Sequence, residues 1–284
     1  MALGCVLAVS VSVLSRVTGA PAGSQQPQLA GSRPGITEPA HSAEKTRVVA
    51  RRDGLAACGQ RLERTPRRAP VLAVAGASYT AGVGPGSPAL SWAVQLARML
   101  HWNAIIDGVP GVGYARTGAG GQGPVLRMLA GEDLRALAPA LVVVQAGHDD
   151  IGVPLRAERR QVEQAIAFIR ATAPGARIGL LTVFTAGPPS PLAVRTDHAI
   201  VAAAAAVDRH VIVMDPLTGR WTFQHYRHGL HPTAAGDAWI ARKVADILRS
   251  RGVRAVPAAS RPVICYSGIP VRPRPSAPPG NPET

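Results

Sequence analysis

A serine bracketed by glycines stands directly after an apolar run near residue 75. The segment reads Gly76-Ala77-Ser78-Tyr79-Thr80-Ala81-Gly82 and follows Val71–Ala75. Glycines allow a sharp turn and a close approach of the backbone to a bound molecule. In open α/β sheets, ligands bind beyond the carboxyl ends of the strands. A serine placed there could act as a nucleophile, although the same turn also occurs in loops that carry no chemistry.

Three further clusters combine glycine with titratable side chains. They are Val109-Pro110-Gly111-Val112-Gly113-Tyr114, Gln145-Ala146-Gly147-His148-Asp149-Asp150 and His228-Gly229-Leu230-His231-Pro232. The first two follow apolar runs, and the third precedes a helical pattern. If the runs are strands of one parallel sheet, we expect the clusters to converge at one edge of it. A serine hydroxyl needs an adjacent base to attack a carbonyl group, and a histidine of the last cluster could supply that base.

Alternating strand and helix patterns position these clusters. The candidate strands are Val71–Ala75, Ala104–Asp107, Leu141–Gln145, Ile178–Phe184 and Val211–Asp215. The candidate helices between and after them are Leu90–Leu100, Val125–Leu137, Ala157–Thr172, Val194–Val207 and Ala234–Arg251. Nearly continuous apolar runs are typical of strands that are buried on both faces. The alternation therefore predicts a single-domain α/β fold: a three-layer α/β/α sandwich around a mostly parallel five-stranded sheet, flavodoxin-like in kind.

The segments on either side of this domain have a different composition. An apolar run, Leu3–Leu14, followed by Ala20-Pro21-Ala22, predicts a signal peptide over residues 1–22 and hence a secreted or cell-envelope protein. Residues 23–69 are rich in Pro, Gly, Ser and Arg, which predicts a basic linker, and residues 257–284 predict a proline-rich disordered tail. The folded domain is expected over residues 70–256, with no transmembrane span and as a monomer.

The net charge of +14 favours anionic partners, and envelope polymers could bind the basic tails. Aromatic residues make up only 4% of the chain, which argues against a surface on which nucleic-acid bases stack.

Cys58 and Cys265 flank the predicted domain. They could form a disulfide in an oxidising compartment or remain two free thiols, and the sequence leaves both open.

The four clusters together resemble the conserved blocks of the SGNH hydrolases, also called the GDSL esterase/lipase family, and especially its secreted actinobacterial branch. The family's Gly-Asp-Ser-x-x-x-Gly block corresponds to Gly76–Gly82, and its second-block glycine to Gly111. Gly-x-Asn-Asp corresponds to Gly147–Asp150, and Asp-x-x-His-Pro to His228–Pro232. The resemblance covers roughly residues 70–252, with the blocks in the family's order.

The resemblance implies an ester hydrolase in which Ser78 is the nucleophile and His231 is its base. It also implies that the amides of Ser78 and Gly111 bind the oxyanion, together with the side chain at position 149. No organic cofactor and no metal are expected. His228 and His231 could form a metal pair with Asp149 or Asp150, but a bare His-x-x-His motif is weak evidence for a metal site.

Three positions depart from the family pattern. Ala77 replaces the first-block aspartate, Asp149 replaces the oxyanion asparagine, and His228 replaces the aspartate that orients the base. An ionised carboxylate can only accept hydrogen bonds, so it would repel an oxyanion. A neutral imidazole can orient His231 but cannot offset the charge of an imidazolium. Asp215 is one candidate for replacing the missing carboxylate.

Two classes of function follow from these residues. The first is a secreted serine ester hydrolase for acyl esters of lipids or envelope glycans, whose activity the substitutions at positions 149 and 228 could reduce. Acyl transfer to a sugar would use the same groups. The second is a catalytically impaired homologue that binds envelope polymers, and a third, weaker interpretation is a cationic adhesion protein that uses the fold only as a scaffold.

Overall fold

A parallel sheet forms the centre of the computed structural model, which describes residues 54–62, 69–85, 87–226, 229–257 and 261–267. Its strands are β1 (Val71–Gly76), β2 (Asn103–Gly108), β3 (Leu141–Gln145), β4 (Arg177–Leu181), β5 (Ile212–Met214) and β6 (Ile264–Tyr266). They lie in the order β5-β4-β3-β1-β2-β6, and every neighbouring pair is parallel. The predicted signal peptide lies outside the described residues.

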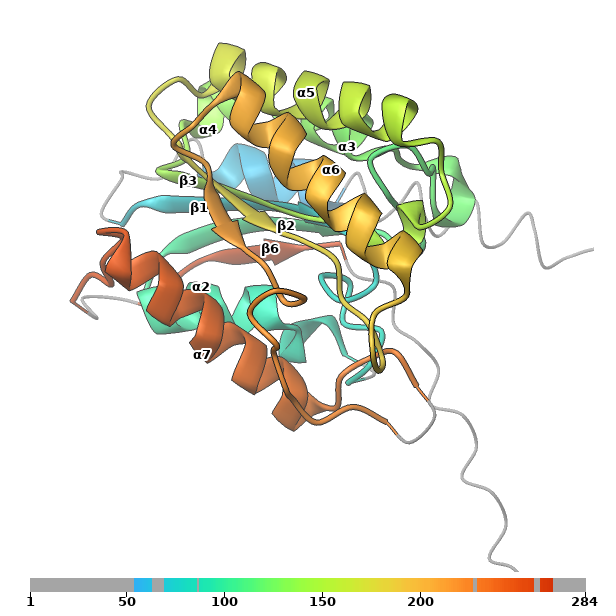
Figure 1. Cartoon of the computed structure of the whole chain (residues 1–284). Coiled ribbons are helices and arrows are strands. Elements are labelled where there is room, and N and C mark those ends of the chain that lie inside the picture. The colour runs from blue at the N-terminus through green and yellow to red at the C-terminus, as the bar shows by residue number, and fades with distance from the viewer. Residues whose placement is uncertain (1–53, 63–68, 86, 227–228, 258–260, 268–284) are drawn as a thin grey trace, which may run out of the picture. The chain divides into compact units, whose positions relative to one another are not determined.

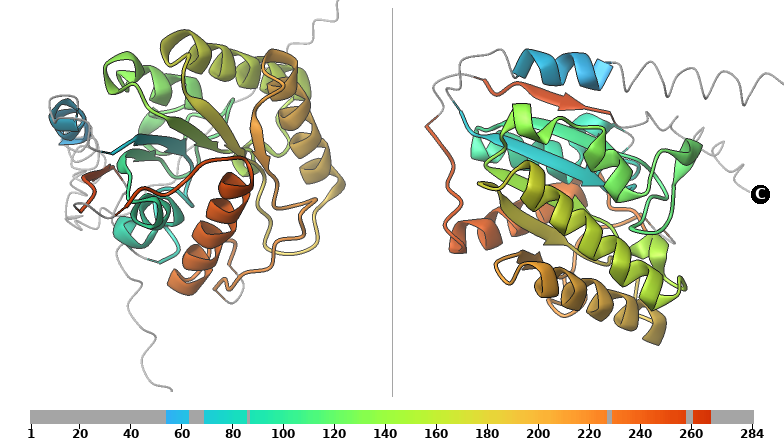
Figure 2. Two further views of the ribbon diagram at one scale, coloured as in Figure 1. Left: turned by 90° about the vertical axis from the view of Figure 1, so that its left-hand side faces the viewer. Right: turned by 90° about the horizontal axis from the view of Figure 1, so that it is seen from above.

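Helices cover both faces of the sheet (Figure 1). One face carries α2 (Trp92–Leu100) and α7 (Ala234–Ser250), and the other carries α3 (Val125–Ala130), α4 (Leu134–Leu137), α5 (Leu155–Thr172) and α6 (Pro191–Val207). Figure 2 shows the same three layers from two other sides. The predicted three-layer α/β/α architecture is therefore confirmed, and all of the described residues belong to one compact unit.

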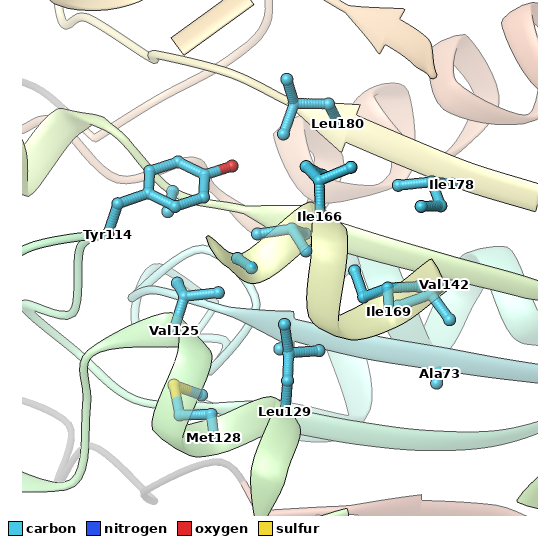
Figure 3. Close-up of a cluster of buried hydrophobic side chains, with 14 of the residues drawn as sticks. Ala73, Tyr114, Val125, Met128, Leu129, Val142, Ile166, Ile169, Ile178 and Leu180 are labelled. Carbon is cyan, nitrogen blue, oxygen red and sulfur yellow. The ribbon is translucent and has the colours of Figure 1, made fainter. Parts of the chain in front are cut away.

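Strand side chains alternate between the two faces, and this alternation builds a core on each side of the sheet. In β1, Leu72 and Val74 pack beneath α2 and α7, whereas Ala73 packs on the opposite side with α3 and α5. Figure 3 shows this second core, in which apolar side chains of the helices meet those of the strands: Val125, Met128, Leu129, Ile166 and Ile169 from α3 and α5, and Val142, Ile178 and Leu180 from β3 and β4. Each such side chain contributes about 1.5–3 kcal/mol when it is fully buried.

The prediction of five strands was wrong by one, because β6 lies in the segment 257–284 that was expected to be irregular. Asn103 fixes the start of this strand: its side-chain oxygen accepts a hydrogen bond from the Val263 amide at 2.9 Å. Three residues are too few to give a recognisable pattern among the prolines of this segment. The strand gains its stability from pairing with β2 instead.

The predicted linker over residues 23–69 also contains regular structure. Residues 54–62 are helical, and Leu55 and Leu62 are buried against the main core. Cys58 of this helix forms a disulfide with Cys265 of β6, which settles the pairing that the sequence left open. The remainder of both flanking segments lies outside the described residues.

Two element boundaries also differ from the predictions. The helix expected over residues 125–137 is divided into α3 and α4, because Asp133 begins a new helix by accepting a hydrogen bond from the Ala136 amide at 3.0 Å. The strand expected over residues 178–184 ends at Leu181, and the chain then leaves the sheet toward α6.

In the part of the chain that the structure describes, no helix combines the length and apolarity needed to cross a bilayer.

The strand order has a switch point at the carboxyl end of β1. The chain passes from β1 to β2 on one side of it and then crosses over to β3 on the other side. At such a switch point the connecting loops diverge and leave room for a ligand. The turn that contains Ser78 follows β1 and is therefore flanked by the loops after β2 and β3, which carry Gly111 and Asp149.

Candidate active site

Ser78 and His231 lie in direct contact. The Oγ atom of Ser78 is 2.9 Å from Nε2 of His231, although 153 residues separate them in the sequence. Ser78 is buried in the turn after β1, and His231 is half-buried in the segment before α7. This distance lies within the range expected for a nucleophile and its base.

The turn that presents Ser78 is held by Gln145, the last residue of β3. The Gln145 side-chain oxygen accepts hydrogen bonds from the Ala77 amide at 3.1 Å, the Thr80 amide at 3.3 Å and the Thr80 hydroxyl at 2.9 Å. Because two of these partners are amides, which can only donate, the atom that faces them must be the oxygen of the side chain. Gln145 thus orders the turn at which Ala77 replaces the aspartate of the family pattern.

Gly76 is required by the tightness of the same turn. A Cβ atom at this position would lie 2.2 Å from the Thr80 hydroxyl oxygen and 3.0 Å from the Gln145 carbonyl oxygen. Any side chain would therefore push Thr80 away from Gln145 and open the turn. The first block needs a glycine here because the backbone of Gly76 lies too close to Thr80 and Gln145 to leave room for a side chain.

Tyr79 links the serine turn to the histidine segment. Its hydroxyl donates a hydrogen bond of 2.6 Å to the carbonyl oxygen of Leu230, the residue before His231. The ring of Tyr79 stacks on Phe184 with a centroid distance of 4.2 Å. Burial raises the pKa of the Tyr79 hydroxyl, which keeps it protonated as a donor. One side chain next to the nucleophile therefore positions the base.

The start of α7 fixes the other side of His231. Thr233 caps this helix by accepting a hydrogen bond from the Gly236 amide at 3.2 Å. The carbonyl oxygen of His231 accepts from the Tyr226 amide at 3.2 Å. Burial lowers the pKa of His231, and the nearby charge of His148 lowers it further. The imidazole is therefore neutral, and able to accept a proton, over a wider pH range than a free histidine.

Two backbone amides that the family resemblance assigns to oxyanion binding follow β1 and β2. Gly111 follows β2 and adopts a left-handed conformation, with φ of 76°, which favours glycine. The amides of Ser78 and Gly111 donate to no acceptor within the described residues. Free amides at the carboxyl end of a parallel sheet are suitable donors for a negatively charged oxygen.

Asp149 lies in a short 3₁₀ helix, η3 (His148–Asp150), directly after β3. Burial raises the pKa of its carboxyl group, while the nearby charges of His148 and Arg116 act in the opposite direction. A protonated carboxyl group can donate a hydrogen bond, and an ionised one cannot. Burial therefore shifts the ionisation of Asp149 toward the form that can donate, as an asparagine does.

Asp150 joins the loops that carry Gly111 and Asp149. Its two carboxylate oxygens accept hydrogen bonds from the Tyr114 amide at 2.7 Å and the Ala115 amide at 2.9 Å. The Asp150 side chain is fully buried. It thus ties the loop after β2 to the loop after β3, and fixes the two walls of the crevice relative to each other.

Among the residues that the structure describes, no carboxylate is bonded to His231 in the way that the family pattern expects. His228, the predicted substitute, lies outside the described residues. Asp215 closes a turn instead, since its side chain accepts from the Leu217 and Thr218 amides at 2.8 and 3.0 Å. Within the described ranges, no group of three or more His, Cys, Asp or Glu side chains could hold a metal ion.

Sequence reasoning missed the roles of Gln145, Tyr79 and Asp150. Gln145 gave a signal that could have been used, because it is a polar side chain at the end of an otherwise apolar strand. The role of Tyr79 depends on a residue 151 positions away and gave no local signal.

Gln145→Leu is expected to lower both stability and any turnover at Ser78. The substitution keeps a side chain of similar size but removes the acceptor of three hydrogen bonds. The Ala77 amide keeps the Gln145 carbonyl oxygen as a partner at 3.0 Å, whereas the amide and the hydroxyl of Thr80 lose theirs. Buried donors without partners cost about 1–3 kcal/mol each, so we expect a loss of about 2 kcal/mol or more in the free energy of unfolding. Denaturant unfolding measures this loss. The control is Gln164→Leu on the exposed side of α5, for which a change below about 0.5 kcal/mol is expected. Equal effects of the two substitutions would contradict the assigned role of Gln145.

The chain was compared with known families and structures. The model of the GDSL-like Lipase/Acylhydrolase family matches residues 74–239. A search of curated proteins found no match.

Several solved structures share the fold. A family two carbohydrate esterase from Clostridium thermocellum, in complex with cellohexaose, has 17% identity and a TM-score of 0.52, with 66% of each chain covered. TesA has 22% identity and a TM-score of 0.52, over 63% of this chain and 98% of TesA. The psychrotrophic esterase EstA from Pseudoalteromonas sp. has 15% identity and a TM-score of 0.50, over 64% of this chain and 97% of EstA.

At these identities the structures establish the fold, whereas the family match rests on the sequence itself. The matched region covers more than half of the 284 residues and contains both Ser78 and His231. The chain therefore belongs to the GDSL-like lipase/acylhydrolase family.

Proposed function

We propose that the chain is a secreted serine ester hydrolase that cleaves acyl esters through an acyl-enzyme on Ser78. The observation that carries the proposal is the 2.9 Å contact between Ser78 Oγ and His231 Nε2. Family membership supports hydrolase chemistry. The disulfide between Cys58 and Cys265 supports an oxidising location, which agrees with export.

The reaction would proceed in two halves. His231 Nε2 removes the proton of Ser78 as Oγ attacks the ester carbonyl carbon. The carbonyl oxygen becomes an oxyanion, which accepts hydrogen bonds from the amides of Ser78 and Gly111. The tetrahedral intermediate then expels the alcohol, which takes the proton from His231. Water repeats these steps on the acyl-enzyme, releases the carboxylic acid and restores the Ser78 hydroxyl.

The base would act without a carboxylate partner among the described residues. An imidazolium that forms during the reaction then lacks a nearby negative charge, and the lowered pKa of His231 makes it still less stable. Replacing the orienting aspartate by asparagine lowers kcat about 10⁴-fold in a well-studied serine protease. We therefore propose slow turnover. Activity should rise with pH through a pKa below the ordinary value of histidine.

The substrate would be an acyl ester of a lipid or of an envelope glycan. A hollow of about 320 Å³ beside the site is lined in part by Trp221, Phe223 and His225. The Phe223 ring contacts Tyr79 edge-on, with centroids 6.4 Å apart, so the hollow is adjacent to the nucleophile turn. Aromatic walls suit the flat faces of a sugar or an acyl chain. The fold shared with carbohydrate esterases agrees with a glycan ester.

Replacing Ser78 tests the proposed nucleophile. Turnover of short-chain p-nitrophenyl esters is expected to fall at least about 10³-fold in Ser78→Ala, because no other group can form the acyl-enzyme. The matched control is Ser87→Ala. Ser87 lies just before η1 (Pro88–Leu90), its side chain caps no amide of that short helix, and its substitution should leave the rate unchanged.

Equal rates above background in Ser78→Ala and the wild type would contradict the assignment of Ser78. Background rates in both proteins would contradict the proposed hydrolase activity on these esters. That result would favour a catalytically impaired homologue that binds envelope polymers.

Asp149→Asn tests the proposed role of the carboxyl group. The pKa of Asp149 is raised, so its protonated fraction falls as the pH rises, and the wild type loses a donor that asparagine keeps. We expect the ratio of variant to wild-type kcat/KM to grow as the pH rises, up to about 10²–10³-fold, which is the loss in rate when one oxyanion donor is removed. The control is Asp246→Asn, a surface position on α7. A ratio that is independent of pH, or below one, would show that Asp149 does not face the oxyanion.

A further inference from the structure

A hollow of about 900 Å³ lies between α5 and α6, away from the catalytic pair. Its charged lining residues are Arg156, Arg159, Arg160 and Glu163 from α5, and Arg195 and His198 from α6. We call this hollow the α5–α6 groove. Figures 1 and 2 show the two helices side by side on one face of the sheet.

The groove concentrates positive charge on both of its walls. Arg156, Arg159, Arg160 and Glu163 follow the spacing i, i+3, i+4 and i+7, so they share one face of α5. Arg195 and His198 are three residues apart and share a face of α6. The four arginines are exposed, and none of them forms an ion pair with an acid among the described residues. One carboxylate, Glu163, thus accompanies four guanidinium groups.

The exposed face of α7 shows that this arrangement is not general in the protein. Arg242, Lys243, Asp246 and Arg249 mix the two signs of charge there, and Arg249 pairs with Asp246 at 2.9 Å. In the groove, by contrast, four arginines and one glutamate line the same concave surface, and the like charges repel. An anion bound between the two walls would remove that repulsion and accept hydrogen bonds from the guanidinium groups.

We propose that the α5–α6 groove binds an anionic polysaccharide chain. Arginine forks recognise carboxylate groups by paired hydrogen bonds, and the repeat of arginines along α5 suits a polymer with repeated carboxylates. No aromatic side chain lines the groove, so nucleic-acid bases have no surface on which to stack. A membrane surface would require a face with several large apolar side chains to insert, whereas Leu155 is the one large apolar side chain among the residues that line the groove.

The two helices that form the groove begin near the edge of the sheet where Ser78 lies. α5 begins directly after η3, at the carboxyl end of β3, and α6 begins after the segment that follows β4. Both helices therefore start at the catalytic edge, and the groove arginines lie in their first halves. A polymer held in the groove could extend from there toward the crevice. Binding itself needs no turnover, so the proposal stands independently of the hydrolase function.

The test is equilibrium binding of the full chain to fluorescent polygalacturonate, measured by anisotropy at about 50 and 200 mM salt. The groove variant is Arg159→Gln/Arg195→Gln, which removes one charge from each wall. The control is Arg242→Gln/Lys243→Gln on α7, which removes the same charge from the opposite layer. We expect the groove variant to bind at least about tenfold more weakly than the wild type, and the control to differ by less than about twofold.

Several results would overturn the proposal. Equal weakening by both variants would show an effect of net charge alone, and no weakening by either would place binding in the basic flanking segments. Equal binding of neutral dextran would exclude recognition of charge. Tighter, groove-dependent binding of phosphatidylglycerol vesicles or of oligothymidylate would assign the groove to a membrane or to nucleic acid. Matching thermal unfolding of all three proteins establishes that the variants are folded.

Discussion

The hydrogen bonds between Gln145 and the turn after β1 are the interaction on which the site depends. They join the ends of the two neighbouring strands at the switch point of the sheet, where the chain diverges to either side. Because Gln145 is buried, its oxygen has no water to replace these partners. The geometry of the nucleophile is therefore set by the sheet itself, and the loops around it add the remaining groups.

Two more tethers extend this order outward from the sheet. The Tyr79 hydroxyl joins the serine turn to the segment before His231. The Asp150 carboxyl group joins the loop after β3 to the loop after β2. Each tether is a buried polar side chain bonded to backbone groups, so each fixes the position of a loop. Three segments that are distant in sequence thus meet within hydrogen-bonding distance of one another.

Electrostatics distinguishes this site from the usual pattern of its family. Buried acids are common in its surroundings: burial raises the pKa of Glu158 and of Asp237 to about 8, and it raises the pKa of Asp149 as well. The protein interior therefore favours neutral carboxyl groups. The same principle shifts Asp149 toward its protonated form, and it disfavours an imidazolium at His231.

The sequence allowed the layers, the parallel sheet and the four clusters to be predicted, because buried strands and amphipathic helices leave strong local patterns. The pairing of Ser78 with His231 was predicted from resemblance to a family, and the structure places the two side chains in contact. β6 was missed because three residues among prolines give no periodic signal. Tyr79 and Asp150 were missed because their roles depend on partners distant in sequence, and the α5–α6 groove was missed because it requires two helices to be side by side.

Labelling with a fluorophosphonate tests the central claim most directly, because it reports an activated serine without knowledge of the substrate. The intact protein is treated with the reagent, and the modified residue is located by peptide mass spectrometry. The account predicts one adduct per chain on Ser78, and labelling that is lost in His231→Ala. Absence of any adduct, or an adduct on another serine that persists in His231→Ala, would contradict the claim that Ser78 and His231 form a working catalytic pair.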